Sequence, residues 1–155
     1  EYYLNKALKS RLDIISLQKQ LNLMEKKREI MDRYPLSLNT VVAREDYNDN
    51  LVNIETATKK LEAVKLNIEK EIRDLYIEAV SAGRNTSNMK KLLDLQKSNL
   101  DKMKRKFELG MISKIMMDQA QLSYDEFESN YKAVLFDYNT KLMKLEFASS
   151  IGLAF

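Results

Sequence analysis

Cysteine and histidine are both absent from this sequence of 155 residues, which has only three glycines and one proline. Without histidine or cysteine, the chain cannot form Ser-His or Cys-His nucleophilic pairs, HExxH zinc sites or the Glu-x-x-His motif of di-iron bundles. No apolar run approaches the roughly 20 residues that a membrane-spanning helix needs. We therefore expect a protein that is not an enzyme, with no cofactor, no metal ion and no transmembrane segment.

The sequence Asp46-Tyr47-Asn48-Asp49-Asn50 begins like a calcium-binding EF-hand loop. The position that requires glycine is Leu51, however, and the twelfth position is Ala57 rather than glutamate. The segment is better explained as the polar start of a helix, which agrees with the absence of a metal site.

What the chain does contain is charge and helix-forming residues. It has 26 basic and 23 acidic residues, a net charge of +3, and this balance does not by itself require nucleic acid or an anionic membrane as a partner. With so few turn formers, this composition is typical of long amphipathic helices.

Apolar residues repeat at alternating spacings of three and four, which is the heptad pattern of a coiled coil. The pattern predicts helices at about 2–33, 40–109 and 114–150, with turns after Pro35 and around Gly110. Gly83 lies inside the middle segment and leaves open whether residues 82–88 kink that helix. The heptad positions with the most regular spacing are Ile72, Leu75, Ala79, Ala82, Thr86, Met89, Leu93, Gln96, Leu100, Met103 and Phe107.

These lengths predict an all-α fold in one coiled-coil domain over residues 1–155. One long helix would form antiparallel hairpins with two shorter helices that are stacked end to end beside it. Each helix of such a fold buries one stripe and leaves its flanks open, so we expect self-association into a homo-oligomer.

A basic cluster, Lys102 with Lys104-Arg105-Lys106, precedes the turn at Gly110. Cations near the end of a helix are favoured by the helix dipole, which explains the cluster without a partner. The functional alternative is a docking patch for an acidic partner. Nucleic acid is not expected, because no basic face with interleaved stacking aromatic residues is visible.

Three stretches resemble the TolC-like outer membrane efflux family. Residues Ala7–Ile14 are similar to its opening A-L-x-x-R-x-D-[IL], although proline is usual at the position of Leu12. Residues Phe107–Ser113, followed by Ala120-Gln121, are similar to its aromatic-x-x-G-x-x-S turn, with departures at Met116 and Asp118. Tyr138, Leu145 and Gly152 match its Y-x6-L-x6-G ending, and Pro35-Leu36-Ser37-Leu38 is similar to the start of a family strand. The β-hairpin of the family is missing, either by deletion or in a relative without a barrel.

The resemblance implies a helical duct or scaffold component of a cell-envelope export system, outside the cytoplasm. Its signal peptide would have preceded Glu1. An adaptor protein would dock at the turn formed by Leu109, Gly110, Met111, Ile112 and Ser113. The alternative function is a structural coiled-coil interaction protein that is not involved in transport.

Overall fold

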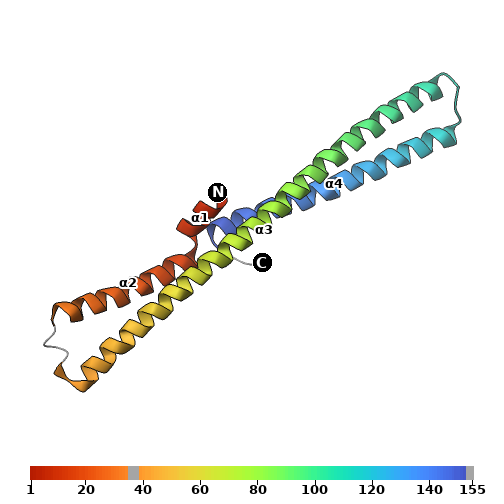
Figure 1. Ribbon diagram of the computed structural model, residues 1–155. Coiled ribbons are helices and arrows are strands. Elements are labelled where there is room, and N and C mark those ends of the chain that lie inside the picture. Colours follow the sequence, from red (N-terminus) through yellow and green to blue (C-terminus); the bar gives the residue numbers. More distant parts are fainter. Residues whose placement is uncertain (35–38, 153–155) are drawn as a thin grey trace. The chain divides into compact units, whose positions relative to one another are not determined.

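The computed structural model describes residues 1–34 and 39–152 (Figure 1). In these residues the protein is all-α, with helices α1 (Tyr2–Ser10), α2 (Leu12–Arg33), α3 (Val41–Glu108) and α4 (Lys114–Ser150), and it contains no strand. None of these helices is long and apolar enough to span a membrane. The expected stop at Pro35 and the strand-like residues 35–38 lie outside the described part.

The chain divides into two compact units that are described separately below. Unit 1 contains Glu1–Asp74 and the residues from Leu145 onward, and unit 2 is the continuous segment Leu75–Lys144. Helix α3 contributes to both units, because it continues without interruption through Asp74 and Leu75. Helix α3 is also continuous through residues 82–88, where the sequence had left open whether the helix is kinked.

Unit 1 contains a helix break at Arg11, where the heptad pattern had predicted one helix over 2–33. Arg11 has extended backbone angles, φ −67° and ψ 130°, and its N–H donates to the carbonyl of Ala7. No proline or glycine causes this break. Its cause is tertiary, because the break places the Arg11 side chain among groups from distant parts of the chain.

The Arg11 guanidinium is buried and has several oxygen partners. It donates to Glu71 on α3 at 2.6 Å, to Asp13 at 2.9 Å and to the carbonyl of Ala148 near the end of α4 at 3.4 Å. Burial lowers the pKa of Arg11, but the hydrogen bonds to Asp13 and Glu71 outweigh burial and raise that pKa above its ordinary value. Arg11 thus stays charged and joins three helices of unit 1.

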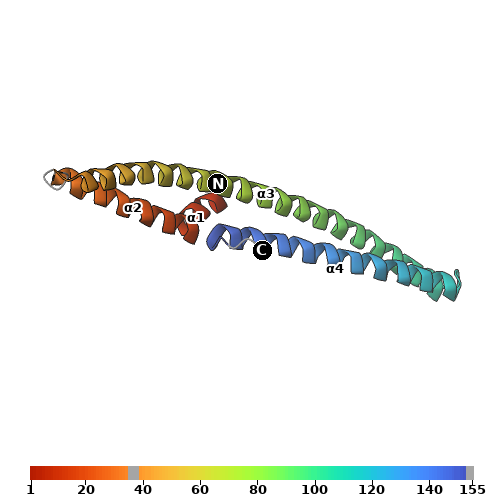
Figure 2. The ribbon, with the colours of Figure 1, turned by 90° about the horizontal axis from the view of Figure 1, so that it is seen from below.

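Helices α2 and α3 run alongside each other within unit 1 (Figures 1 and 2). Asn50 donates to the carbonyl of Met24 at 3.0 Å, and Lys27 pairs with Asp46 at 2.6 Å. Residue numbers rise along one helix as they fall along the other. The core of this unit is formed by apolar side chains from all of its helices: Ala7, Ile14, Leu21, Leu61, Ile68, Ile72, Leu145 and Ala148.

Unit 2 consists of the second part of α3 beside most of α4 (Figure 2). Thr86 donates to the carbonyl of Val134 at 3.4 Å, and the Lys90 ammonium lies 5.5 Å from the centre of the Tyr131 ring. The heptad positions of α3 face this contact. Ala79, Ala82, Thr86, Leu93 and Leu100 are buried, Leu75, Met89, Gln96 and Met103 are half-buried, and Phe107 is exposed.

Gly83 lets α4 approach α3 closely. A Cβ atom at this position would lie 3.1 Å from Cε2 of Tyr138. In a helix interior, glycine is less favourable than alanine by about 1 kcal/mol. Its place in an unbroken helix therefore follows from the packing of the tyrosine ring.

Helix α3 ends at Glu108, and Gly110 two residues later has the left-handed conformation expected of a glycine that caps a helix, with φ +69°. The backbone N–H of Gly110 donates to the carbonyl of Phe107 at 2.9 Å, and the backbone N–H of Met111 donates to the carbonyl of Lys106 at 2.8 Å. These two bonds form a Schellman motif. Ser113 begins α4, since its hydroxyl accepts from the N–H of Met116 at 3.4 Å.

We expect Gly110→Val to lower the free energy of unfolding by about 1–2 kcal/mol, because the left-handed conformation places Cβ too close to the following carbonyl oxygen. Nothing lies within 4 Å of the added Cβ, so the loss is backbone strain and not a clash. Urea unfolding followed by circular dichroism measures it. Gly110→Asn is the control and should lose less, since asparagine tolerates this conformation better. Equal losses for the two variants would contradict the explanation.

Candidate nucleic-acid interface

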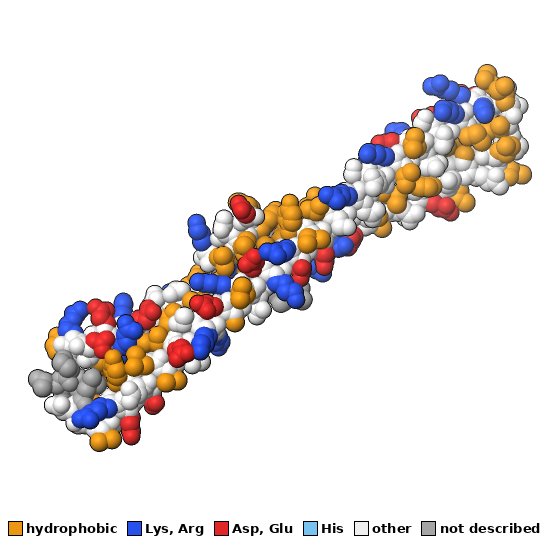
Figure 3. Space-filling view, viewed as in Figure 1, with side chains coloured by type: hydrophobic (Ala, Val, Ile, Leu, Met, Phe, Trp, Pro, Cys, Tyr) orange, Lys and Arg blue, Asp and Glu red, His pale blue; other side chains and the backbone are white. Residues whose placement is uncertain are grey.

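Positive charge is concentrated in residues 84–114, which we call the basic segment. It contains nine basic and three acidic residues, whereas residues 48–83 contain five basic and seven acidic ones. The segment runs along the second part of α3 to the first residue of α4. Figure 3 shows basic side chains together with hydrophobic ones at the end of unit 2 where α3 gives way to α4.

The basic residues repeat with the heptad of the helix. Lys90, Lys97 and Lys104 are spaced by seven residues, and Arg84, Lys91 and Arg105 occupy the neighbouring register. Seven residues advance an α-helix by about 10.5 Å, so each series forms a row along α3. Because Leu93 and Leu100 turn toward α4 and are buried, both rows remain exposed to solvent.

Most of these cations have no acidic partner. Lys90 pairs with Asp94 at 3.3 Å. The other eight make no ion pair or side-chain hydrogen bond within the described residues: Arg84, Lys91, Lys97, Lys102, Lys104, Arg105, Lys106 and Lys114. In residues 48–83, two of the five cations form ion pairs: Lys59 with Glu55 at 2.6 Å and Arg73 with Glu69 at 2.7 Å. The cations of the basic segment are therefore available to an external anion.

The side of unit 2 formed by α4 has the opposite charge. Residues 115–131 contain four acidic residues and no basic one. An extended polyanion would thus be attracted to the α3 side and repelled by the first half of α4.

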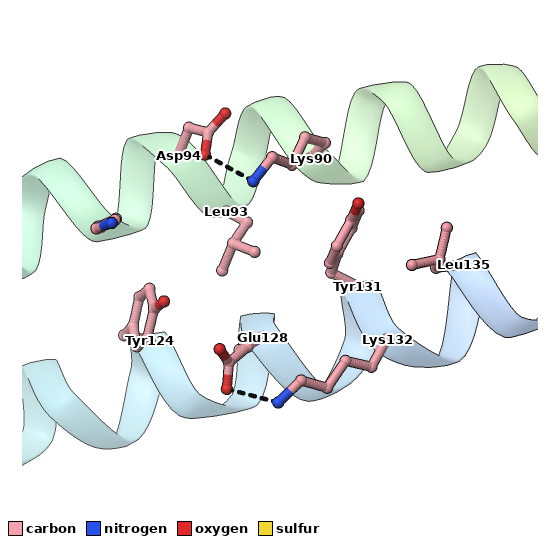
Figure 4. Close-up of a pocket in the computed structure, with 9 residues that line it drawn as sticks. Lys90, Leu93, Asp94, Tyr124, Glu128, Tyr131, Lys132 and Leu135 are labelled. Carbon is pink, nitrogen blue, oxygen red and sulfur yellow. Dashed lines mark hydrogen bonds and ion pairs between the residues drawn. The ribbon is translucent and has the colours of Figure 1, made fainter.

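A shallow groove lies between the two helices within unit 2 (Figure 4). Lys90, Leu93, Asp94 and Lys97 line it from α3, and Tyr124, Glu128, Tyr131, Lys132 and Leu135 line it from α4. Leu93 points between the two tyrosine rings, while the charged groups lie at the rim, where Lys132 pairs with Glu128 at 2.8 Å. The tyrosines thus pack within the protein and are not a stacking surface for bases.

Among the described residues, no group of three or more acidic side chains could hold a metal ion. What the basic segment offers is a row of exposed, unpaired cations. Such a row binds phosphates through charge and does not read base edges.

The five residues predicted as an adaptor-docking turn do lie together, between α3 and α4. Leu109 and Met111 are exposed, with 74% and 69% of their surface accessible. Ile112 is half-buried, and Gly110 and Ser113 are exposed and provide the helix caps described above. The turn lies inside the basic segment, between Lys106 and Lys114, but it contains no charged group of its own.

Comparison with known families gives one match, which covers residues 48–119. The matching family model is described as "GapR-like, DNA-binding domain". No curated protein and no solved structure matches the chain. The matched segment is just under half of the chain, and it contains the whole basic segment and most of α3.

This match contradicts the resemblance to the TolC-like outer membrane efflux family, and the assignment to that family is wrong. The short motifs that suggested it are dominated by capping residues and helix-packing positions, which recur in unrelated helical proteins. The predicted role as an export duct fails with the assignment. The alternative role fails as well. A structural coiled-coil protein with no nucleic-acid partner conflicts with the match to a DNA-binding family.

The predictions about partners and location are corrected by the same finding. The exclusion of nucleic acid is wrong, and the adaptor partner loses its basis. The extracytoplasmic location in the cell envelope is wrong as well, because it came from the efflux resemblance alone. The comparison does not address self-association.

Sequence reasoning noticed part of the basic segment and missed its extent. It singled out Lys102 and Lys104–Lys106 and explained them by the helix dipole. Counting charges over a longer window would have separated residues 84–114 from the nearly balanced remainder of the chain. The lack of ion pairs could not be found in this way, because it depends on side-chain positions.

Proposed function

We propose that this protein binds double-stranded DNA through the basic segment on α3 and acts by binding rather than by catalysis. The observation that carries the proposal is the coincidence of two features. The segment similar to a DNA-binding domain contains the stretch in which eight of nine cations have no ion pair. Phosphate contacts supply most of the affinity in sequence-independent DNA binding.

The fold supports this function by keeping the cations in register. We propose that α3 packs against α2 in unit 1 and against α4 in unit 2 as antiparallel coiled-coil hairpins, with apolar heptad positions in each contact. The expected end-to-end stacking of the shorter helices stays a prediction. In this arrangement Leu93 and Leu100 hold one face of α3 inward, Lys104 and Arg105 are exposed, and Lys97 is exposed at the rim of the groove between the helices.

The mode of binding follows from the residue types. Lysine is a point charge that contacts phosphate without geometric selectivity, and two of the nine basic residues are arginines. Because Phe107 is the one aromatic residue of the basic segment, base stacking is limited to it, and we expect weak dependence on base sequence.

The test is fluorescence anisotropy of the intact chain with a labelled duplex of arbitrary sequence, over a range of salt concentrations. Each phosphate contact contributes a slope of about −0.9 to the logarithmic salt dependence of the binding constant. If half of the eight free cations engage, the slope is about −3.6. Binding of two unrelated duplexes should agree within about threefold, which is less than the roughly 1 kcal/mol cost of one mismatched base pair in specific recognition.

A polyglutamate of matched length serves as the control for non-specific attraction to acidic polymers. Tighter binding to DNA than to polyglutamate supports the proposal. Equal binding to both would reduce the basic segment to a patch for any acidic partner, and no binding to DNA at low salt would overturn the proposal.

A further inference from the structure

The outer face of α4 in unit 2 displays a second apolar stripe, directed away from α3. Ile115, Leu122, Phe136 and Met143 are spaced by seven or fourteen residues, and Ser129 occupies the remaining position of this series. Their exposed fractions are 70%, 61%, 74% and 58%, while the residues of α4 that face α3 are half-buried or buried. We call Ile115, Leu122, Ser129, Phe136 and Met143 the outer stripe.

This spacing is a packing pattern and not scattered apolar exposure. A seven-residue repeat returns to nearly the same side of an α-helix, with a drift of about 20° per repeat. A coiled-coil seam has two apolar positions per heptad, and the outer stripe supplies one of them as a line of large side chains on one side of α4. Within unit 2, α3 occupies the opposite side of α4, so nothing in this unit covers the outer stripe.

The charges beside the stripe favour a second copy of α4 in the opposite direction. Residues 115–128 contain four acidic residues and no basic one, whereas residues 130–144 contain three basic and one acidic. An antiparallel pair places each acidic half beside a basic half. A parallel pair would place the two acidic halves together, and such like-charge contact is unfavourable.

The outer stripe has apolar residues at the same distances, seven and fourteen residues, on both sides of Ser129. A twofold axis near Ser129 would bring Leu122 of one copy close to Phe136 of the partner subunit, and Ile115 close to Met143 of the partner subunit. The same axis places Asp125 of each copy beside Lys132 of the partner subunit, so this pair of opposite charges occurs twice in the dimer. A surface that complements itself in this way is what a twofold interface requires.

We propose that the outer stripe of α4 is the interface of a homodimer, in which two copies of α4 pack antiparallel about a twofold axis near Ser129. The proposal does not depend on DNA binding, because it uses α4 alone and is tested without nucleic acid.

Disulfide crosslinking tests the position of the axis, and the chain suits it because it has no native cysteine. Under mild oxidation, Ser129→Cys should form a disulfide-linked dimer about a hundredfold faster than Ser98→Cys on α3, because proximity replaces micromolar collisions with a millimolar effective concentration. Equal rates for these two exposed positions would overturn the proposal.

A second pair of variants tests the direction of the helices. In the antiparallel dimer, Gln119 lies about 30 Å from its own copy, since twenty residues of axial offset separate the two. Gln119→Cys alone should therefore crosslink slowly, whereas a mixture of Gln119→Cys and Thr140→Cys should give the mixed disulfide. Rapid crosslinking of Gln119→Cys alone would show a parallel pair and contradict the proposed interface.

Sedimentation equilibrium at high micromolar concentration supplies the third readout. The wild type should have the mass of a dimer, and Leu122→Asp with Phe136→Asp should have the mass of a monomer and keep its helical circular dichroism. Leu23→Asp, an equally exposed leucine on α2 in unit 1, is the matched control and should remain dimeric. A monomeric wild type, or a dimeric double variant, would overturn the proposal.

Discussion

Replacing Leu93 or Leu100 by aspartate should lower the free energy of unfolding by about 3–5 kcal/mol. Both side chains are buried, with 6% and 4% of their surface exposed, and both lie at heptad positions of α3 that face α4. Truncating a buried leucine costs about 2–5 kcal/mol. Aspartate adds a group that must be desolvated as an ion or protonated.

The measurement is urea unfolding followed by circular dichroism at 222 nm, with the free energy obtained by linear extrapolation. Leu95→Asp provides a control of the same chemistry on the same helix, because Leu95 is exposed. A surface change of this kind costs about 0.5 kcal/mol or less. If all three variants lose the same stability, the heptad register assigned to α3 is wrong.

The second large effect concerns DNA. Reversing three charges by Lys104→Glu, Arg105→Glu and Lys106→Glu should weaken binding by about 10²–10³-fold at low salt, since three phosphate contacts are lost and three repulsions are introduced. The logarithmic salt slope should become shallower by up to about 2.7. The fold should be unchanged, because all three side chains are exposed and none forms an ion pair in the described part of the chain.

A control variant must distinguish the effect of a lower net charge on DNA binding from the effect of losing the cations of the basic segment. The variant Lys9→Glu, Lys19→Glu and Lys26→Glu makes the same change in charge outside the segment that matches the DNA-binding family. These lysines are also exposed and form no ion pair with any residue that the structure describes. We expect it to lose much less affinity. Comparable losses for the two triple variants would mean that the total charge of the protein, and not the basic segment, governs binding.

The all-α class was predictable from sequence because it depends on local features. Heptad spacing identified Ala79, Ala82, Leu93 and Leu100 as buried, and Gly110 identified the end of α3. The break at Arg11 was not predictable, because Leu12 and Ser10 are compatible with a continuous helix. That break depends on Glu71 and Ala148, which are 60 and 137 residues away in sequence.

The candidate site was only partly predictable, for a related reason. The charges of Lys97 and Lys104 are evident from the sequence, but so are Asp94, Asp101 and Glu108, each four residues from one of the lysines of the heptad row. Spacing of this kind permits an ion pair on a helix, and the structure forms it only between Lys90 and Asp94. Whether a cation is available to a ligand was therefore decided by side-chain geometry.

The composition of unit 1 has a consequence for how the chain folds. Unit 2 is one continuous segment closed by the turn at Gly110, so its contacts can form as soon as that segment exists. Unit 1 joins the first and last parts of the chain, as in the ion pair between Lys6 and Glu146, which are 140 residues apart. Contacts between distant residues form slowly, because the intervening chain must first be ordered. We therefore expect unit 2 and the contact between α2 and α3 to form before the contacts of Arg11, whose partner carbonyl belongs to Ala148.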